Sequence, residues 1–243
     1  RRQGNYLLAS GQSRQGRKRR GGAVSEYHDG YQRESGADMI KNAEWLFFDI
    51  GSTLIDEHLA YEARIRKIAE AANTTYDNAY KTALDFYKQN QKGDLETAKL
   101  FGVSLPSWDK EYETPYSDTV QCLDFLSGKY KIGVIANQSL GTKRRLESYG
   151  LIKYIDLVVA SAEEGVAKPD KRIFETALSQ SGCKASDSVM IGDRIDNDIV
   201  PANLLGMHTV WIRQGFWRYW SIKNDIEKAD YTVNSLSELC EIL

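Results

Sequence analysis

The chain has 243 residues, of which 42% are hydrophobic and 27% charged, and its formal net charge is −2. This composition is typical of a globular protein with one domain, or with a core and a smaller insertion. No run of about 18 apolar residues occurs, which argues against a membrane-spanning protein. The three cysteines lie far apart and form neither a metal spacing nor a disulfide framework, so we expect a cytoplasmic location.

Residues 1–38 differ from the rest of the chain in composition. They include the basic run RQGRKRR and hold 8 of the 32 basic residues but only 4 of the 34 acidic ones. Such a segment buries too little apolar surface to order itself, so we predict a disordered extension; a nucleic-acid-binding arm is the alternative. The remaining chain then has a net charge near −6, which argues against nucleic-acid binding by the folded part.

From Met39 onward, short apolar runs alternate with segments of helical periodicity. The predicted strands are Trp45–Asp49, Lys131–Ala136, Ile155–Ala160, Ser188–Ile191, His208–Ile212 and Tyr231–Val233. Helical patterns between them include Tyr116–Ser127, Thr142–Tyr149 and Lys171–Ser181. Continuous apolar strands separated by helices predict an α/β fold with a Rossmann-like, doubly wound parallel sheet. We assign residues 39–56 and 117–243 to this core domain.

One long interval, from Asp56 to Tyr130, interrupts the alternation. It contains no convincing strand, whereas HLAYEARIRKIAEAA, TYDNAYKTALDFYKQN and DLETAKLFGV have helical spacing. The prolines of SLPSW and ETPY suit linkers. An insertion directly after the first strand would lie over the strand ends, so we predict a helical cap domain at residues 57–116.

Polar residues follow the carboxyl ends of several predicted strands. Asp49 ends the first strand, residues 136–139 end the second, and Lys168 stands before a helix that follows the third. Asp193 and Asp198 lie in the loop after the fourth. Singly, Lys168 fits a solvated lysine and Asp198 a helix N-cap. Because parallel strands end at one edge of a sheet, we expect these residues to converge there and to offer oxygen ligands for Mg²⁺.

The segments FFDIGSTL, VIAN, AKPDKRIF and GDRIDNDI, in this order, resemble the four motifs of the haloacid dehalogenase-like (HAD) superfamily. The likeness runs from about Trp45 to the last residue, and the insertion is similar to the helical (C1-type) cap between that family's first two motifs. The resemblance implies a hydrolase, with Mg²⁺ as cofactor and a small phosphorylated metabolite as substrate.

The resemblance also implies a role for each matching residue. Asp49 would be the nucleophile that forms an aspartyl intermediate, and Lys168 would neutralise charge on it and on the transferred group. Asp193 would bind Mg²⁺ together with Asp49 and the backbone carbonyl of Gly51. Asp198 would support the metal, directly or through water.

The chain departs from the family's phosphatase pattern beside the transferred group. Gly51 stands where phosphatases of the family usually carry a second aspartate, the general acid and base, whose loss typically costs about 10²–10⁴ in rate. Ala136 replaces a serine or threonine that binds the phosphoryl oxygens. Asn137, which follows it, would contribute to catalysis and substrate binding, and Gln138 or Ser139 is a possible substitute for the hydroxyl.

Four functions therefore compete. The favoured one is a Mg²⁺-dependent phosphatase whose leaving group needs no proton, or whose acid is Asp56, Glu57 or His58 at the predicted hinge. A HAD-fold binding or regulatory protein with weak or no turnover is the main alternative. Phosphonate cleavage would require a Schiff-base lysine in the cap. A carbon–halogen hydrolase would not need metal, so the Asp193/Asp198 pair argues against it.

The run WIRQGFWRYW, after the fifth predicted strand, interleaves arginines with aromatic residues. This pattern fits nucleobase stacking, a protein contact surface, or simple packing of the rings on a neighbouring helix. The sequence carries no signal for an oligomeric state.

Overall fold

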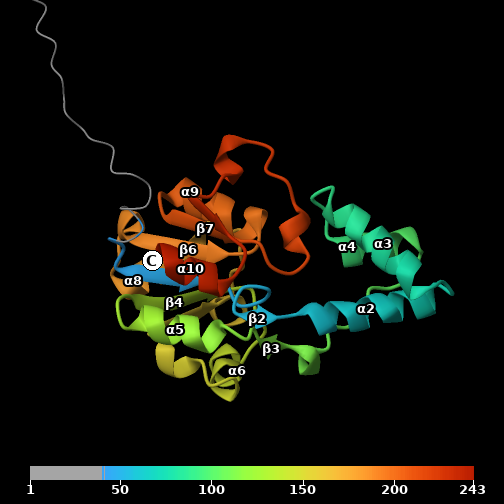
Figure 1. Ribbon diagram of the computed structural model, residues 1–243, viewed down its shortest axis with the longest axis horizontal. Coiled ribbons are helices and arrows are strands. Elements are labelled where there is room, and N and C mark those ends of the chain that lie inside the picture. Colours follow the sequence, from blue (N-terminus) through green and yellow to red (C-terminus); the bar gives the residue numbers. More distant parts are fainter. Residues whose placement is uncertain (1–39, 41) are drawn as a thin grey trace, which may run out of the picture. The chain divides into compact units, whose positions relative to one another are not determined.

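The computed structural model describes Ile40 and residues 42–243, so the predicted extension, residues 1–38, lies outside the described part. The central sheet has six parallel strands in the order β5-β4-β1-β6-β7-β8 (Figure 1). Their bounds are β1 Trp45–Phe48, β4 Lys131–Ala136, β5 Leu157–Ala160, β6 Ser188–Gly192, β7 His208–Ile212 and β8 Tyr231–Val233. The predicted Rossmann-like α/β fold is confirmed.

Strand β1 lies in the middle of the sheet. Trp45 pairs with Lys131 of β4 on one side and with Ser188 of β6 on the other. The chain passes from β1 outward through β4 to β5, then returns to the opposite side of β1 for β6, β7 and β8. This reversal puts the carboxyl ends of β1, β4 and β6 next to one another, at the kind of switch point where α/β sheets bind ligands.

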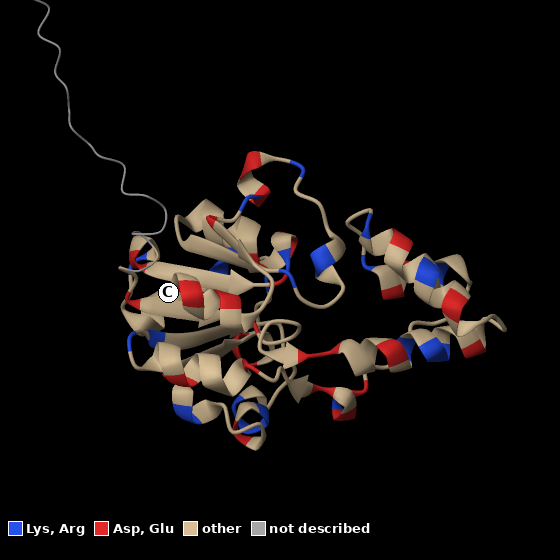
Figure 2. Cartoon of the chain, in the orientation of Figure 1, with Lys and Arg blue, Asp and Glu red and all other residues tan. Residues whose placement is uncertain are grey.

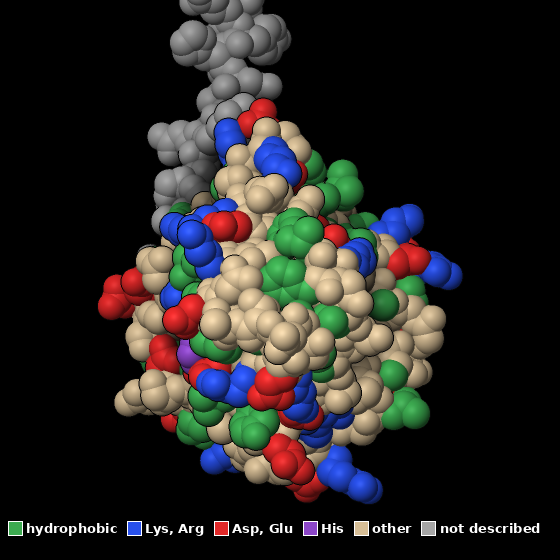
Figure 3. Space-filling model, turned by 90° about the vertical axis from the view of Figure 1, so that its right-hand side faces the viewer, with side chains coloured by type: hydrophobic (Ala, Val, Ile, Leu, Met, Phe, Trp, Pro, Cys, Tyr) green, Lys and Arg blue, Asp and Glu red, His purple; other side chains and the backbone are tan. Residues whose placement is uncertain are grey.

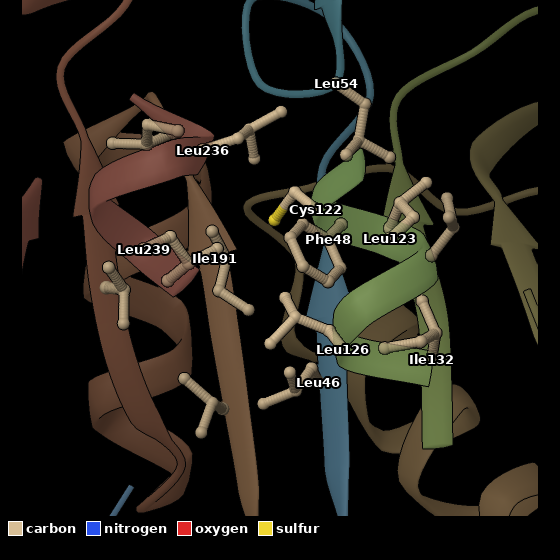
Figure 4. Close-up of a cluster of buried hydrophobic side chains, with 14 of the residues drawn as sticks. Leu46, Phe48, Leu54, Cys122, Leu123, Leu126, Ile132, Ile191, Leu236 and Leu239 are labelled. Carbon is tan, nitrogen blue, oxygen red and sulfur yellow. The ribbon is translucent and has the colours of Figure 1, made fainter. Parts of the chain in front are cut away.

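Successive strand residues point to opposite sides of the sheet. Because both sides carry apolar residues, helices cover both faces. Leu46 and Phe48 pack with α5 and α10, as Figure 4 shows, whereas Phe47 faces α8 and α9 in a second buried cluster. The helices of the core are α5 Thr119–Ser127, α6 Thr142–Ser148, α7 Ser161–Glu164, α8 Lys171–Ser181, α9 Val200–Leu205 and α10 Leu236–Ile242. One-turn elements lie at Lys110–Tyr112, Ile152–Tyr154, Ala185–Asp187, Ile195–Ile199, Trp217–Tyr219 and Asp225–Glu227.

The long interval after β1 forms three helices, α2 His58–Ala71, α3 Tyr76–Tyr87 and α4 Gly93–Leu100. The prediction that it holds no strand is wrong. Ile55–Asp56 (β2) and Thr114–Pro115 (β3) form a two-stranded antiparallel sheet where the chain leaves for the helices and returns. Strands of two residues show no periodicity, and a proline is tolerated in an edge strand, so the sequence pattern hides them. The division into core and cap at residues 57 and 116 stays a prediction.

The aromatic run after β7 packs against this helical insertion. The ring of Phe216 stacks on Tyr87 of α3 at 4.8 Å and meets Tyr61 of α2 edge-on at 5.1 Å. The Asn90 side chain, just after α3, exchanges hydrogen bonds with the backbone of Ser221. These contacts support the third interpretation of WIRQGFWRYW, in which its aromatic rings pack on neighbouring helices.

The face of the insertion seen in Figure 3 carries charged side chains of both signs. Acidic and basic side chains are interspersed on this face. Among the described residues, no helix has the length and apolar character needed to cross a membrane.

Candidate active site

Three aspartates meet at the carboxyl ends of the central strands. Asp49 follows β1, and its backbone N–H donates to the Ile191 carbonyl at 2.9 Å, which continues the β1–β6 ladder. Asp193 follows β6, and Asp198 belongs to the short turn Ile195–Ile199 behind it. Each offers a carboxylate oxygen, and these oxygens lie within 4.8 Å of one another. The sequence prediction that these strand ends converge agrees with this geometry.

Lys168 joins two of these acids. Its Nζ lies 2.7 Å from Oδ1 of Asp49 and 2.6 Å from Oδ1 of Asp198, and only 2% of the lysine side chain is exposed. Burial by itself lowers the pKa of Lys168, but the carboxylates of Asp198 and Asp49 outweigh it, so the pKa lies above its ordinary value. The interpretation of Lys168 as a solvated lysine is therefore wrong.

Asp198 is buried, and its position depends on Gly192. A Cβ atom at Gly192 would lie 2.4 Å from Cγ of Asp198, so any larger residue would displace the carboxylate. The second oxygen of Asp198 accepts the backbone N–H of Arg194 at 3.0 Å. Since Oδ1 of Asp198 also accepts from Lys168, both carboxylate oxygens have partners at the site. The interpretation of Asp198 as only a helix N-cap is therefore wrong.

The side chain of Asn137 contacts the backbone of Lys168. Its Oδ1 accepts the Lys168 N–H at 2.7 Å, and its Nδ2 donates to the Lys168 carbonyl at 2.8 Å. Both ends of the amide thus fix the lysine's backbone beside the site. Ala136, at the end of β4, is fully buried. Of its predicted substitutes, Gln138 lines the cavity at Asp49, whereas the Ser139 hydroxyl accepts hydrogen bonds from Lys110 and Arg145.

The acids fit a divalent cation. Oδ1 of Asp193 is buried and has no hydrogen-bond partner. Burial, reinforced by the charges of Asp49 and Asp198, raises the pKa of Asp193 well above its usual range. Burial also raises the pKa of Asp198, to about 6, against the opposing effect of Lys168. Three clustered carboxylates with one lysine leave negative charge uncompensated, and a hard cation with oxygen ligands would balance it.

Glu57 joins the site from the insertion side. Acidic residues stand on both crossings between sheet and insertion (Figure 2), and Glu57 lies on the outgoing one. It shares with Asp49 a cavity of about 150 Å³, lined by Asp49, Gly51, Glu57, Tyr61, Asn137, Gln138, Lys168, Asp193, Arg194, Asn197 and Trp217. Asp56 and His58, the other two hinge candidates, line a neighbouring cavity instead. Burial raises the pKa of Glu57 to about 8, although a hydrogen bond from Ser52 opposes the shift.

Four further lining residues were not singled out as site residues from the sequence. Arg194 holds Asp196 with Nη2 2.5 Å from Oδ2, and its guanidinium lies 4.2 Å from the centre of the Trp217 ring. Its position directly after Asp193 was the available signal. Asn197 carries no such signal, Tyr61 is one of several aromatic residues of the predicted cap that could face the site, and Trp217 reaches the cavity from a loop distant in sequence.

Similarity to known proteins identifies the family of this chain. The family model described as HAD-hydrolase-like matches residues 165–239. The pyrimidine 5'-nucleotidase YjjG of Escherichia coli is 30% identical over 224 residues, which cover 82% of this chain and 97% of that protein. This chain belongs to the HAD superfamily. It is a HAD-like hydrolase, as its strand-end motifs indicated.

Two further proteins, both named as phosphatases, extend the comparison. A glyceraldehyde 3-phosphate phosphatase of Methanocaldococcus jannaschii is 39% identical over 131 residues, which are 53% of this chain and 56% of that relative. The crystal structure of a HAD phosphatase from Thermococcus onnurineus superposes with a TM-score of 0.55 at 25% identity, covering 82% of this chain and 97% of that one. The shared fold therefore extends over the helical insertion as well as the sheet.

Proposed function

We propose that this protein hydrolyses phosphate monoesters of small metabolites through an aspartyl-phosphate on Asp49, with Mg²⁺ as cofactor. The observation that carries the proposal is the buried Lys168 between Asp49 and Asp198, beside the unpartnered Oδ1 of Asp193. Keeping such a cluster buried costs free energy, and buried titratable groups of this kind concentrate at functional sites.

The residues divide the work as follows. Asp49 supplies the nucleophilic oxygen, and Lys168 holds that carboxylate in position and neutralises part of the incoming negative charge. Asn137 fixes the backbone of Lys168. Asp49, Asp193 and the Gly51 carbonyl would hold Mg²⁺, with Asp198 in support, and the bound ion would supply positive charge to the phosphoryl oxygens.

The small cavity supports a small substrate. Its volume of about 150 Å³ is below the roughly 300–1,000 Å³ of pockets for drug-sized ligands. The relatives named for glyceraldehyde 3-phosphate and for pyrimidine 5'-nucleotides support a phosphorylated metabolite as the substrate class.

The other hydrolytic chemistries have less support. Phosphonate cleavage through a Schiff base needs a lysine at the site, and Lys168, held by two carboxylates, is the one lysine among the residues described as lining this cavity. The predicted cap lysines, Lys67, Lys81, Lys88, Lys92 and Lys99, are not among them. A carbon–halogen hydrolase needs no metal, so that function would not explain why the carboxylates of Asp49, Asp193 and Asp198 lie so close together.

A panel of phosphorylated metabolites, assayed with Mg²⁺ and with a chelator, tests the proposal. We expect Mg²⁺-dependent release of phosphate from at least one member, and none from Asp49→Asn. The buried methyl of Ala136, in place of a phosphate-binding hydroxyl, favours one competing function, a binding protein. Mg²⁺ binding without turnover of any phosphate ester would decide for that alternative.

A further inference from the structure

The carboxyl group of Glu57 occupies the space beside Gly51. A Cβ atom built on Gly51 would lie 2.5 Å from Oε1, 2.9 Å from Cδ and 3.0 Å from Oε2 of Glu57. By standard bond lengths, the oxygens of an aspartate lie about 2.4 Å from its own Cβ. Oε1 of Glu57 therefore lies at nearly the distance from this point that an aspartate oxygen at residue 51 would have, and Oε2 lies about 0.6 Å further away than such an oxygen.

The local backbone explains how a residue six positions later reaches this place. Ser52 adopts a left-handed conformation, with φ of 53°, in the turn that separates Gly51 from β2. Its hydroxyl donates to Oε2 of Glu57 at 2.8 Å and holds the carboxyl toward the turn. Glu57 is also the N-cap residue of α2, yet its side chain makes no capping hydrogen bond. A role in starting the helix therefore does not explain where the carboxyl points.

We propose that Glu57 is the general acid and base of the reaction, replacing from the insertion the aspartate that residue 51 lacks. The inference rests on the proposed phosphatase function. It follows from the position of the carboxyl beside Gly51 and from the cavity that Glu57 shares with Asp49, Lys168 and Asp193.

The two steps balance in atoms and protons. In the first, an Asp49 oxygen bonds to phosphorus, the bond from phosphorus to the ester oxygen breaks, and the proton of Glu57 passes to that oxygen. In the second, Glu57 takes a proton from water as the water oxygen attacks phosphorus. The bond from phosphorus to Asp49 then breaks, which releases phosphate and restores both side chains.

Glu57→Gln tests the role because it keeps the shape and removes the proton. We expect kcat/KM for an alkyl phosphate such as glycerol 3-phosphate to fall by about 10²–10⁴, and that for 4-nitrophenyl phosphate to fall much less, since nitrophenolate leaves without a proton. Glu62→Gln, which removes a half-buried acid of the same helix that pairs with Arg66, is the matched control and should leave both rates unchanged.

A second readout separates catalysis from folding. With 4-nitrophenyl phosphate, Glu57→Gln should release a burst of nitrophenol near the enzyme concentration and then slow, because the aspartyl-phosphate forms but lacks a base for its hydrolysis. Acid quenching should trap phosphate on Asp49. A variant that is merely misfolded gives neither burst nor trapped phosphate.

Relocating the carboxyl completes the test. Gly51→Asp combined with Glu57→Ala should recover alkyl phosphate turnover at least 10-fold over Glu57→Ala alone, since Gly51 has no left-handed φ that would disfavour aspartate. Equal alkyl turnover in wild type and Glu57→Gln overturns the role of Glu57 and leaves the phosphatase proposal intact. A wild type that hydrolyses no phosphate ester overturns both.

Discussion

The carboxyl group of Glu57 fills the space that a side chain at residue 51 would need, because a Cβ atom on Gly51 would lie 2.5 Å from Oε1 of Glu57. This contact decides what Gly51→Asp does on its own. The sequence pattern implies a gain of about 10²–10⁴ in alkyl phosphate turnover, whereas the structure predicts a change below about 10-fold, because the new carboxyl displaces an existing one. Steady-state kinetics on wild type, Gly51→Asp and Gly51→Asp/Ala136→Ser measure it. A gain above about 100-fold in the single variant would show that the place beside residue 51 is functionally vacant.

Mg²⁺ should raise the melting temperature, because it binds the folded cluster of Asp49, Asp193 and Asp198 and not the unfolded chain. At a concentration of 100 times Kd, the stabilisation should be about 2.7 kcal/mol. Asp193→Asn should abolish the shift, and Asp225→Asn, on the exposed surface, should leave it unchanged. Calorimetry with millimolar Mg²⁺ checks binding directly, and absence of any heat would contradict the metal site.

Replacement of Lys168 by methionine should strongly destabilise the protein in chelator. The change leaves Asp49 and Asp198 without their shared cation, and losing one partner of a buried ion pair typically costs about 3–5 kcal/mol. Lys171→Met is the control, since its exposed pair with Glu175 should contribute at most about 1 kcal/mol. Urea unfolding compares the two. Adding Asp198→Asn to Lys168→Met should recover part of the lost free energy of unfolding. If Lys168→Met and Lys171→Met lowered that free energy equally, the buried ion pairs of Lys168 with Asp49 and Asp198 would be contradicted.

Phe216→Ala should disrupt the packing of the β7 loop against the insertion. The ring is buried between Tyr61 and Tyr87, and truncating a buried phenylalanine costs about 3–5 kcal/mol. Phe125→Ala, at a ring with 44% of its surface exposed, should cost far less. Thermal melts measure the difference. Similar melting temperatures for the two variants would show that the loop does not support the insertion.

The pair of His208 and Asp230 should make stability depend on pH. The hydrogen bond that Nδ1 of His208 donates to Oδ2 of Asp230, at 3.4 Å, raises the pKa of His208 above 6.5, with burial opposing the shift and the charge of Asp187 adding to it. The folded state therefore binds the proton more tightly, so the contribution is fully present below pH 6.5 and is lost as pH rises through the folded pKa. Urea unfolding from pH 5 to 9 should show a gap between wild type and His208→Gln that narrows as pH rises. A gap that widens at high pH would reverse this assignment.

Local pattern was enough to predict the sheet and most of the cluster. The predicted strands Lys131–Ala136, His208–Ile212 and Tyr231–Val233 match the observed bounds, because each is a buried apolar run between turns. Asp49, Lys168, Asp193 and Asp198 could be proposed together because parallel strands end at one edge. The β2–β3 pair could not be found, since two residues carry no period and their pairing joins positions about 60 residues apart.

Only the tertiary structure decided which hinge residue reaches the site. Asp56, Glu57 and His58 are equivalent candidates in the sequence, and the direction of each side chain depends on the left-handed turn at Ser52 and on where α2 begins. The same holds for Asn137, whose amide binds the Lys168 backbone 31 residues later. Sequence patterns report local periodicity, whereas these contacts depend on the three-dimensional paths of segments that approach only when the whole sheet has formed. For this reason the sequence could show that residue 51 has no carboxyl group, whereas only the tertiary structure could show that the carboxyl group of Glu57 lies beside it.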